Sequence, residues 1–305
     1  DDLKNAFSGT AGSIKIKSTE HYNDLGYDGS TITGVTVAAR NPGSWANKLK
    51  VAIIDDLADQ VLQFSTLPTN IQVGFGITQA IPPNTVVAGS GTTSLLTGYF
   101  KGIVTEVDTT LKKASVKILE SVTEAGVSTT VDYQPNGIYK FGNTVATIHN
   151  NSGVATGTGS PTGNSDWFDQ QAIQLTNSTI NWNNIAERPG TSSFAEARDS
   201  RFDEVHVVVI DDTGEVTGNA GTILEKHLAL SKAKDGLYSL GSPSYWRKYL
   251  YNNSTNIFGG SAPSGIVTTS FGEGATNFTL SADVGWDQNA QGINFAGIGV
   301  TTLTL

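Results

Sequence analysis

The chain has 305 residues, 34 glycines and no cysteine, and only 15% of its residues are charged, for a net charge of −9. This composition is typical of a β-rich, loop-rich globular protein. It excludes disulfides, thiolate metal sites and cysteine nucleophiles. The acidic balance, without clustered Lys or Arg, argues against a nucleic-acid surface.

No segment approaches the roughly 20 consecutive apolar residues of a membrane span. The chain also contains no methionine, and its last residues, 300–305, alternate as a strand does. We therefore expect the sequence to be an excerpt from a longer polypeptide.

In chain order, residues 1–12 look like a tail or linker, and 13–17 (SIKIK) alternate as a strand does. Further strands are expected within 31–39 and 49–54. From 63 to 142, short alternating runs separated by Gly, Pro and Asn are typical of a small barrel or sandwich. The Gly/Ser/Thr-rich segment 150–166 is low in complexity and predicts a mobile loop.

The second half begins with a strongly apolar strand candidate at 204–210. Thr222 and Glu225 have the spacing of a capping box, which predicts a helix that begins there and ends before Gly236. Ser242-Pro243 predicts the start of a second helix over 245–252. Strands are expected at 256–260 and 265–271.

Together these patterns predict an α+β, mainly β, fold. We expect a β-sandwich-like domain with a few short helices, built from 1–62 and 143–305. A small antiparallel β-barrel domain, 63–142, is expected as an insertion at the periphery.

Asp212-Thr213-Gly214 follows the apolar run and matches the catalytic tripeptide of aspartic proteases. Such an enzyme needs two carboxylates that share one proton. No second Asp-Thr/Ser-Gly occurs in the chain, and subunits that pair across a homodimer are usually far shorter. The alternative interpretation is a turn, because Asp and Gly favour turns for steric reasons. The residues favour the turn.

No metal or cofactor site is predicted. The acidic run 211–215 lacks the alternating oxygen ligands of a calcium loop, and the four histidines (His21, His149, His206 and His227) are not spaced as i, i+4. No G-x-S-x-G elbow is present. The glycines of 155–163 precede no expected helix, so they do not form a phosphate loop.

Two polar stretches each place an arginine beside a Pro-Gly turn. The first contains Arg40, Pro42, Gly43, Trp45 and Asn47, and the second contains Arg188, Pro189 and Gly190. One interpretation is a binding surface. The other, which the chemistry favours, is that each guanidinium donates to loop carbonyls and holds the turn.

These stretches resemble a known family. The segment AARNPGSWANKLKVAI (38–53) is similar to the A-R-x-P-G-x-W-G-N-x-L-x-V motif of contractile-tail sheath proteins of T4-like phages, with Ala46 in place of the usual glycine. The segment 187–236 resembles the order seen in sheath proteins of marine T4-like phages: an R-P-G-T-S turn, a D-E-x-H-V-V-V strand, a D-x-x-G turn and T-G-x-x-G-x-I-L-E-K. Blocks at 245–250, 256–260 and 286–300 continue this order. The resemblance covers about 13–56 and 166–305 and is weak over 63–165.

The resemblance implies that Asp212 and Gly214 belong to a hairpin turn on an outer domain of a non-enzymatic structural subunit. Such subunits polymerise helically around a tail tube and contract to drive the tube through the host envelope. It also implies a virion protein, assembled in the host cytoplasm, that needs no cofactor. Its partners would be other copies of itself, with the tube and baseplate contacted by regions outside this chain. Within a sheath, we expect 63–142 and 150–166 to face solvent.

Two other functions stay open from the residues. The chain could be a surface-glycan-binding β module of a phage or secreted protein, in which tryptophans offer stacking platforms; the candidates are Trp45, Trp167, Trp182, Trp246 and Trp286. Less favoured is an aspartic hydrolase that acts through Asp212.

Overall fold

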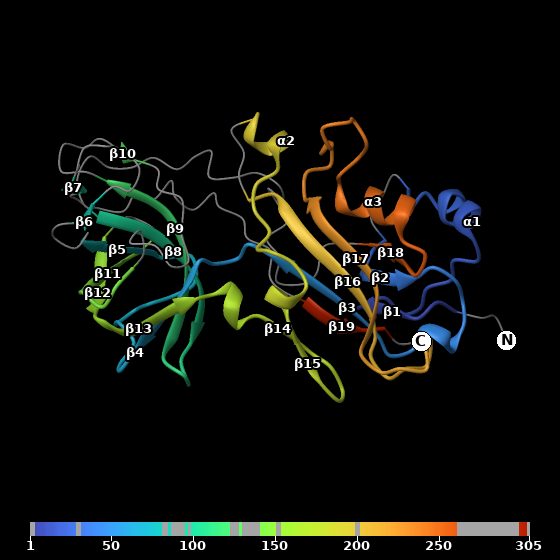
Figure 1. The fold of residues 1–305 in the computed structure, drawn as a ribbon, viewed down its shortest axis with the longest axis horizontal. Helices are drawn as coiled ribbons and strands as arrows, with labels where there is room; N and C mark the ends of the chain where they lie inside the picture. Colours follow the sequence, from blue (N-terminus) through green and yellow to red (C-terminus); the bar gives the residue numbers. More distant parts are fainter. Residues whose placement is uncertain are drawn as a thin grey trace. The chain divides into compact units, whose positions relative to one another are not determined.

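The computed structural model describes residues 4–28, 32–80, 85–86, 95–96, 99–122, 128–129, 141–150, 154–198, 202–260 and 299–303. Antiparallel strands dominate, with a few short helices, so the predicted mainly-β α+β fold is confirmed. The described residues form two compact units (Figure 1). The first unit holds 4–56, 172–260 and 299–303, and the second holds 57–171. The second unit begins before and ends after the segment 63–142 that the sequence suggested as a separate domain.

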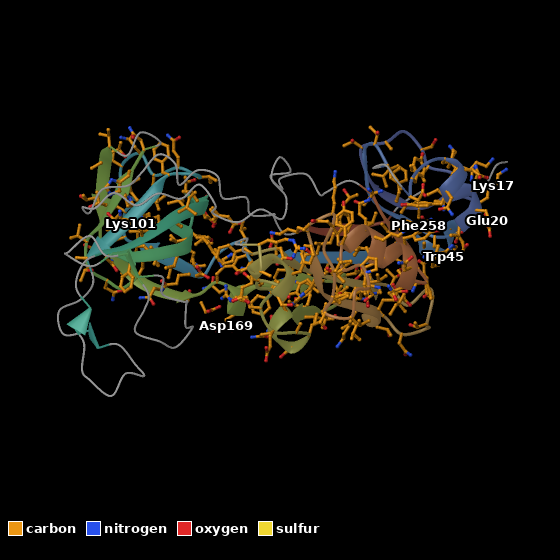
Figure 2. All side chains as sticks on the ribbon, turned by 90° about the horizontal axis from the view of Figure 1, so that it is seen from above. Lys17, Glu20, Trp45, Lys101, Asp169 and Phe258 are labelled. Carbon is orange, nitrogen blue, oxygen red and sulfur yellow. The ribbon has the colours of Figure 1, made fainter. Side chains whose placement is uncertain are left out.

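The first unit contains a four-stranded sheet and a three-stranded sheet, ordered β17-β16-β3-β19 and β1-β2-β18. Apolar side chains from both sheets and from the helix α3 share one core cluster. A second cluster packs α1 against β2 and Phe258 of β18 (Figure 2). The elements of this unit are β1 (Phe7–Gly9), α1 (Thr19–Asp24), β2 (Val35–Ala39), η1 (Ser44–Ala46), β3 (Leu49–Asp55), β14 (Ala172–Gln174), β15 (Thr179–Asn181), η3 (Trp182–Asn184), α2 (Ser193–Glu196), β16 (Glu204–Asp211), β17 (Thr222–Ser231), α3 (Trp246–Asn253), β18 (Ile257–Gly259) and β19 (Gly299–Thr302).

Residues 4–12 do not form the tail that the sequence suggested. Asn5 is fully buried, and its amide donates to the carbonyls of Ile16 and Ala39, at 3.1 and 2.8 Å. Its side-chain oxygen accepts from the amide of Ile16 at 2.7 Å. The segment 13–17 therefore shows the alternating burial of a strand, but its backbone bonds to this asparagine and lies outside any sheet ladder.

The helix predicted from Thr222 is wrong, because 222–231 forms the strand β17 along the edge of β16. The capping-box residues find other partners. Thr222 donates its hydroxyl to the carbonyl of Asn219, and Glu225 binds the segment after α3. Pairing with a buried strand outweighs local helix preference here. The second predicted helix is confirmed, as α3, which begins at Trp246.

The second unit is built on an eight-stranded sheet whose main order is β12-β11-β5-β8-β9-β4-β13, with β10 paired to β9. The edge strands β12 and β13 are joined through Ser160 alone, so the sheet curls until two of its corners meet. The expected closed barrel stays a prediction. The elements of the second unit are β4 (Gln60–Phe64), β5 (Gly76–Ala80), β6 (Thr85–Val86), β7 (Leu95–Leu96), β8 (Tyr99–Asp108), β9 (Lys113–Val122), β10 (Ser128–Thr129), β11 (Ala146–His149), β12 (Ala155–Gly159), β13 (Pro161–Asp166) and η2 (Phe168–Gln170).

The mobile loop predicted at 150–166 is also wrong over its described part, which forms β12 and β13. Glycine here reflects close packing: a Cβ on Gly157 would lie 2.1 Å from the carbonyl oxygen of Thr69. A second one, on Gly159, would lie 2.8 Å from a ring carbon of Pro68. These two glycines therefore mark positions where another segment comes close to the strand, as glycines within strands often do. The strand expected at 265–271 lies outside the described residues.

Candidate functional site

Arg40 holds the end of helix α3. Its guanidinium donates to the carbonyls of Tyr251 and Ser254, at 3.1 and 2.6 Å, and lies 4.5 Å from the centre of the Phe258 ring. Because those carbonyls have no partner within the helix, the cation satisfies them and also opposes the negative end of the helix dipole. Burial lowers the pKa of Arg40 from its ordinary value. This arginine serves the fold.

The turn after Arg40 is held by its own backbone. Gly43 has a φ of 121°, which favours glycine, and its amide donates to the carbonyl of Lys4 at 2.9 Å. The indole nitrogen of Trp45 donates to the carbonyl of Asn41 at 3.1 Å, and the amide of Asn47 donates to Ser44 at 3.0 Å. Pro42 lies half-buried within this turn. The turn leads directly into β3.

The second arginine also has an internal partner. Arg188 pairs with the carboxylate of Asp56 at 3.1 Å, and both side chains are largely buried. Pro189 is buried, and Gly190 exchanges two hydrogen bonds with Glu204, at 2.9 and 3.1 Å. The Arg188–Asp56 ion pair fixes the 187–190 turn onto the end of the sheet where β3 ends and β16 begins.

The Asp-Asp-Thr-Gly segment forms the start of the loop between β16 and β17. Asp211 accepts from the amides of Gly214, Val216 and Thr217, at 2.9, 3.0 and 2.7 Å. Burial alone would raise the pKa of Asp211, but these bonds outweigh it and lower the pKa. Gly214, with a φ of 82°, supplies the left-handed residue that the loop requires.

Asp212 faces a different set of donors. It accepts from the amide and the hydroxyl of Thr176, at 2.7 and 2.6 Å, and pairs with Lys50 at 3.2 Å. Burial would raise the pKa of Asp212, but Thr176 and Lys50 outweigh it, so the pKa is lowered. An aspartic protease needs one carboxyl to stay protonated beside another. This environment instead favours an ionised aspartate that ties β3, β16 and the 175–178 turn together.

The Arg40 turn and the Asp212 loop lie beside two strands that pair with each other. Strand β3 pairs with β16 in antiparallel register from Leu49 opposite Asp211 to Asp55 opposite Val205. Two lysines reach the loop beyond β16: Lys48, just before β3, pairs with Glu215 at 3.1 Å, and Lys50 of β3 pairs with Asp212. The Arg40 turn and the Asp212 loop are therefore parts of one sheet end.

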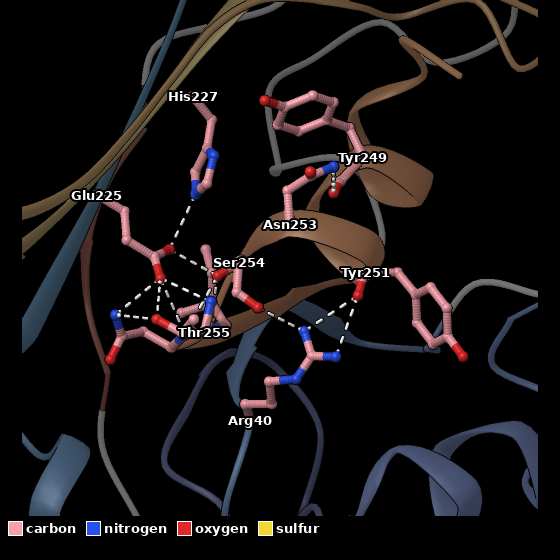
Figure 3. Close-up of polar contacts among 10 residues, drawn as sticks. Arg40, Glu225, His227, Tyr249, Tyr251, Asn253, Ser254 and Thr255 are labelled. Carbon is pink, nitrogen blue, oxygen red and sulfur yellow. Dashed lines mark hydrogen bonds and ion pairs between the residues drawn. The ribbon is translucent and has the colours of Figure 1, made fainter. Parts of the chain in front are cut away.

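A third cluster was not predicted from the sequence. Glu225 of β17 accepts from the amide and hydroxyl of Thr255, each at 2.7 Å, and from the side-chain amide of Asn256 at 2.8 Å (Figure 3). Its other oxygen accepts from the Ser254 hydroxyl at 2.6 Å and contacts His227 Nε2 at 2.9 Å. Burial opposes the charge, but these hydrogen bonds, led by His227, lower the pKa of Glu225 to about 2.

The combination of Ser254, Glu225 and His227 contains the residue types of a catalytic triad, but in the wrong order. In a triad the histidine lies between serine and carboxylate, and takes the serine proton. Here the carboxylate lies between the two others and accepts from both. The serine has no base, and the cluster joins β17 to the end of α3.

Charges buried in the first unit are also paired. Lys232 donates to Asp55 at 2.7 Å, and their side chains are 1% and 0% exposed. The neighbouring Asp203 accepts from the hydroxyls of Ser192 and Ser231, at 2.7 and 2.6 Å. Removing either partner of the Lys232–Asp55 pair would take away the counter-ion of a buried charge, which is strongly destabilising.

Three of the five tryptophans offer no exposed ring. Trp167, Trp182 and Trp246 are 1%, 0% and 3% exposed, and Trp286 lies outside the described residues. Within the described part of the chain, no group of three or more His, Asp or Glu side chains could hold a metal ion. None of the helices described is long and apolar enough to cross a membrane.

Comparison of the chain with protein families, with curated proteins and with solved structures finds no match.

Proposed function

We propose that this chain is the outer part of a structural subunit of a contractile tail sheath, which polymerises around a tail tube and contracts. The observation that supports this most is spatial. The two segments that carry the resemblance, 38–53 and 187–236, supply three adjacent strands of one sheet, β3, β16 and β17. The two segments thus belong to one structural unit.

The polar residues of that unit fit a rigid body better than an active site. The cation of Arg40 and the carboxylates of Asp212 and Glu225 each bind several internal donors or acceptors. Lowered carboxyl pKa values favour permanent charge over proton transfer. A subunit that rotates and slides during contraction needs this kind of internal bracing.

The mechanism would follow from assembly. Identical subunits joined by contacts between different surfaces extend into a helix without closing. Contraction would then be a switch between two packings of the same subunits. The partners would be other copies of the protein, with the tube and baseplate contacted elsewhere, and the site of action would be the virion.

Expression of the complete gene product tests this proposal. Sedimentation velocity should show large assemblies, and negative-stain microscopy should show long striated tubes. The Asp212→Asn variant should form the same tubes, because that carboxylate has a structural role in one subunit. A dispersed, monomeric product would contradict the proposal, as would acid-dependent peptide cleavage that the Asp212→Asn variant loses.

A further inference from the structure

A groove of about 530 Å³ lies within the second unit. Its floor is one face of β8 and β9 beside Val61 of β4, and its wall is the segment 167–171, which includes η2. Figure 2 labels Asp169, the middle residue of η2. This volume falls in the range of small-ligand sites, roughly 300–1,000 Å³.

The strand register explains why this face is polar. Glu106 and Asp108 alternate on β8 and lie opposite Ser115 and Lys113 of β9. The residues between them on β9, such as Ala114, point to the core of the unit. Because strand side chains alternate between faces, the core takes the apolar set and the groove takes the charged and hydroxyl set.

The groove is rich in planar groups with spare acceptors. Glu106 uses one carboxylate oxygen to accept from the Ser115 hydroxyl at 2.9 Å, and Asp108 uses one to accept from the amides of Thr110 and Leu111. Within the described residues, the second oxygen of each carboxylate has no partner. Gln171 donates its amide to the Trp167 carbonyl at 2.9 Å, which leaves its side-chain oxygen as an acceptor.

Apolar surface lies beside these groups. Leu111 is 57% exposed, whereas Val61 is 7% exposed and Val107 packs partly against the core. Trp167 is only 1% exposed, so no aromatic face is offered for stacking.

We propose that this groove binds a neutral saccharide. Carboxylate and amide groups accept hydrogen bonds from hydroxyls in pairs, and the exposed Leu111 side chain can cover the C–H face of a sugar. Two carboxylates against Lys113 disfavour anionic ligands, while the polar floor disfavours purely apolar ones. Without aromatic stacking the affinity should be weak, with a Kd on the order of 1–10 mM. The inference is independent of a sheath role, because it uses only the second unit.

Two-dimensional ¹⁵N NMR of the whole chain tests this. Maltohexaose, cellohexaose and chitohexaose are titrated separately to about 20 mM, which is above the expected Kd. At least one sugar should shift amides of 106–115 and 167–171, and leave those of the first unit unchanged. No shift with any of the three, or shifts spread over both units, would overturn the proposal.

Two variants and one control give a second readout. Glu106→Ala and Gln171→Ala should each weaken binding at least fivefold. Gln72→Ala, an exposed glutamine of the same unit outside the groove, should bind as the parent does. Equal affinity in all three variants would overturn the proposal. So would stronger shifts from spermine than from any sugar, because they would identify a cation site.

Discussion

Replacement of Glu225 by glutamine tests the internal bracing of the first unit. Glutamine keeps the shape of the side chain, but it removes the charge and turns an NH₂ group toward groups that now donate, including Ser254 and Thr255. A folded-state pKa of about 2 against an ordinary 4.5 corresponds to roughly 3 kcal/mol of folding stability at neutral pH, at about 1.4 kcal/mol per pKa unit. The Glu225 side chain is 10% exposed, so solvent screens its charge only a little.

The pH dependence has a defined sign. Because the folded-state pKa is depressed, the stabilisation is complete above 4.5 and is lost as pH falls toward 2. The difference in unfolding free energy between parent and Glu225→Gln should therefore be about 3 kcal/mol at pH 7 and about half of that at pH 3.

Urea unfolding followed by tryptophan fluorescence measures this difference at each pH, with Trp182 and Trp246 as buried reporters in the first unit. The matched control is Glu196→Gln, an exposed glutamate of α2, which should change stability by less than about 0.5 kcal/mol. A Glu225→Gln variant as stable as this control, or a difference that does not change with pH, would refute the account of this cluster.

Three other predictions concern packing and charge. Lys232→Met should destabilise the first unit by about 3–5 kcal/mol in urea unfolding, because it removes the cation that pairs with the buried Asp55. Adding Asp55→Leu should restore most of the lost stability, and no recovery would contradict this pairing. Gly157→Ala should destabilise the second unit by about 1–3 kcal/mol, because its Cβ would overlap the Thr69 backbone. Gly163→Ala should be tolerated, because the nearest atom to its Cβ lies at 4.0 Å. Similar losses of stability at both positions would argue against the close approach of Gly157 to Thr69. Asp212→Asn should cost about 1–3 kcal/mol in the same assay through its lost pair with Lys50, and an unchanged midpoint would mean that the ion pair contributes nothing.

The strand pattern of the sequence predicted much of the fold. The apolar runs at 49–54 and 204–210 are strands, and they pair with each other as a buried centre should. The helix at 245–252 also follows from its local sequence. These segments agree because local preference and tertiary packing favour the same structure.

The two wrong predictions, the helix from Thr222 and the mobile loop at 150–166, have a common physical cause. The run 222–231 has a helix-like start, yet β16 needs a partner on that edge, and tertiary pairing decided the outcome. The glycines of 155–159 resemble a flexible loop in composition, but they allow close backbone contact with Thr69. Composition does not distinguish a glycine that allows motion from one that allows packing.

The candidate site shows the same limit. Pro-Gly turns beside arginines were recognisable, but Arg40 donates to the carbonyls at the end of α3 and not to those of its own turn. The cluster around Glu225 was missed, because its donors come from 254–256 and only the fold brings them to β17. A glutamate in a β-strand beside a histidine two residues away is the only local signal.

The central proposal is that the first unit keeps its fold as one body within a sheath subunit. Helical reconstruction by electron cryomicroscopy of tubes formed by the complete gene product, in extended and contracted forms, tests it most directly. The account predicts tubes in both forms, with β3, β16 and β17 paired as here and the Lys50–Asp212 and Lys232–Asp55 pairs intact in each. Failure to form tubes, or a first unit whose strands re-pair between the two forms, would contradict it.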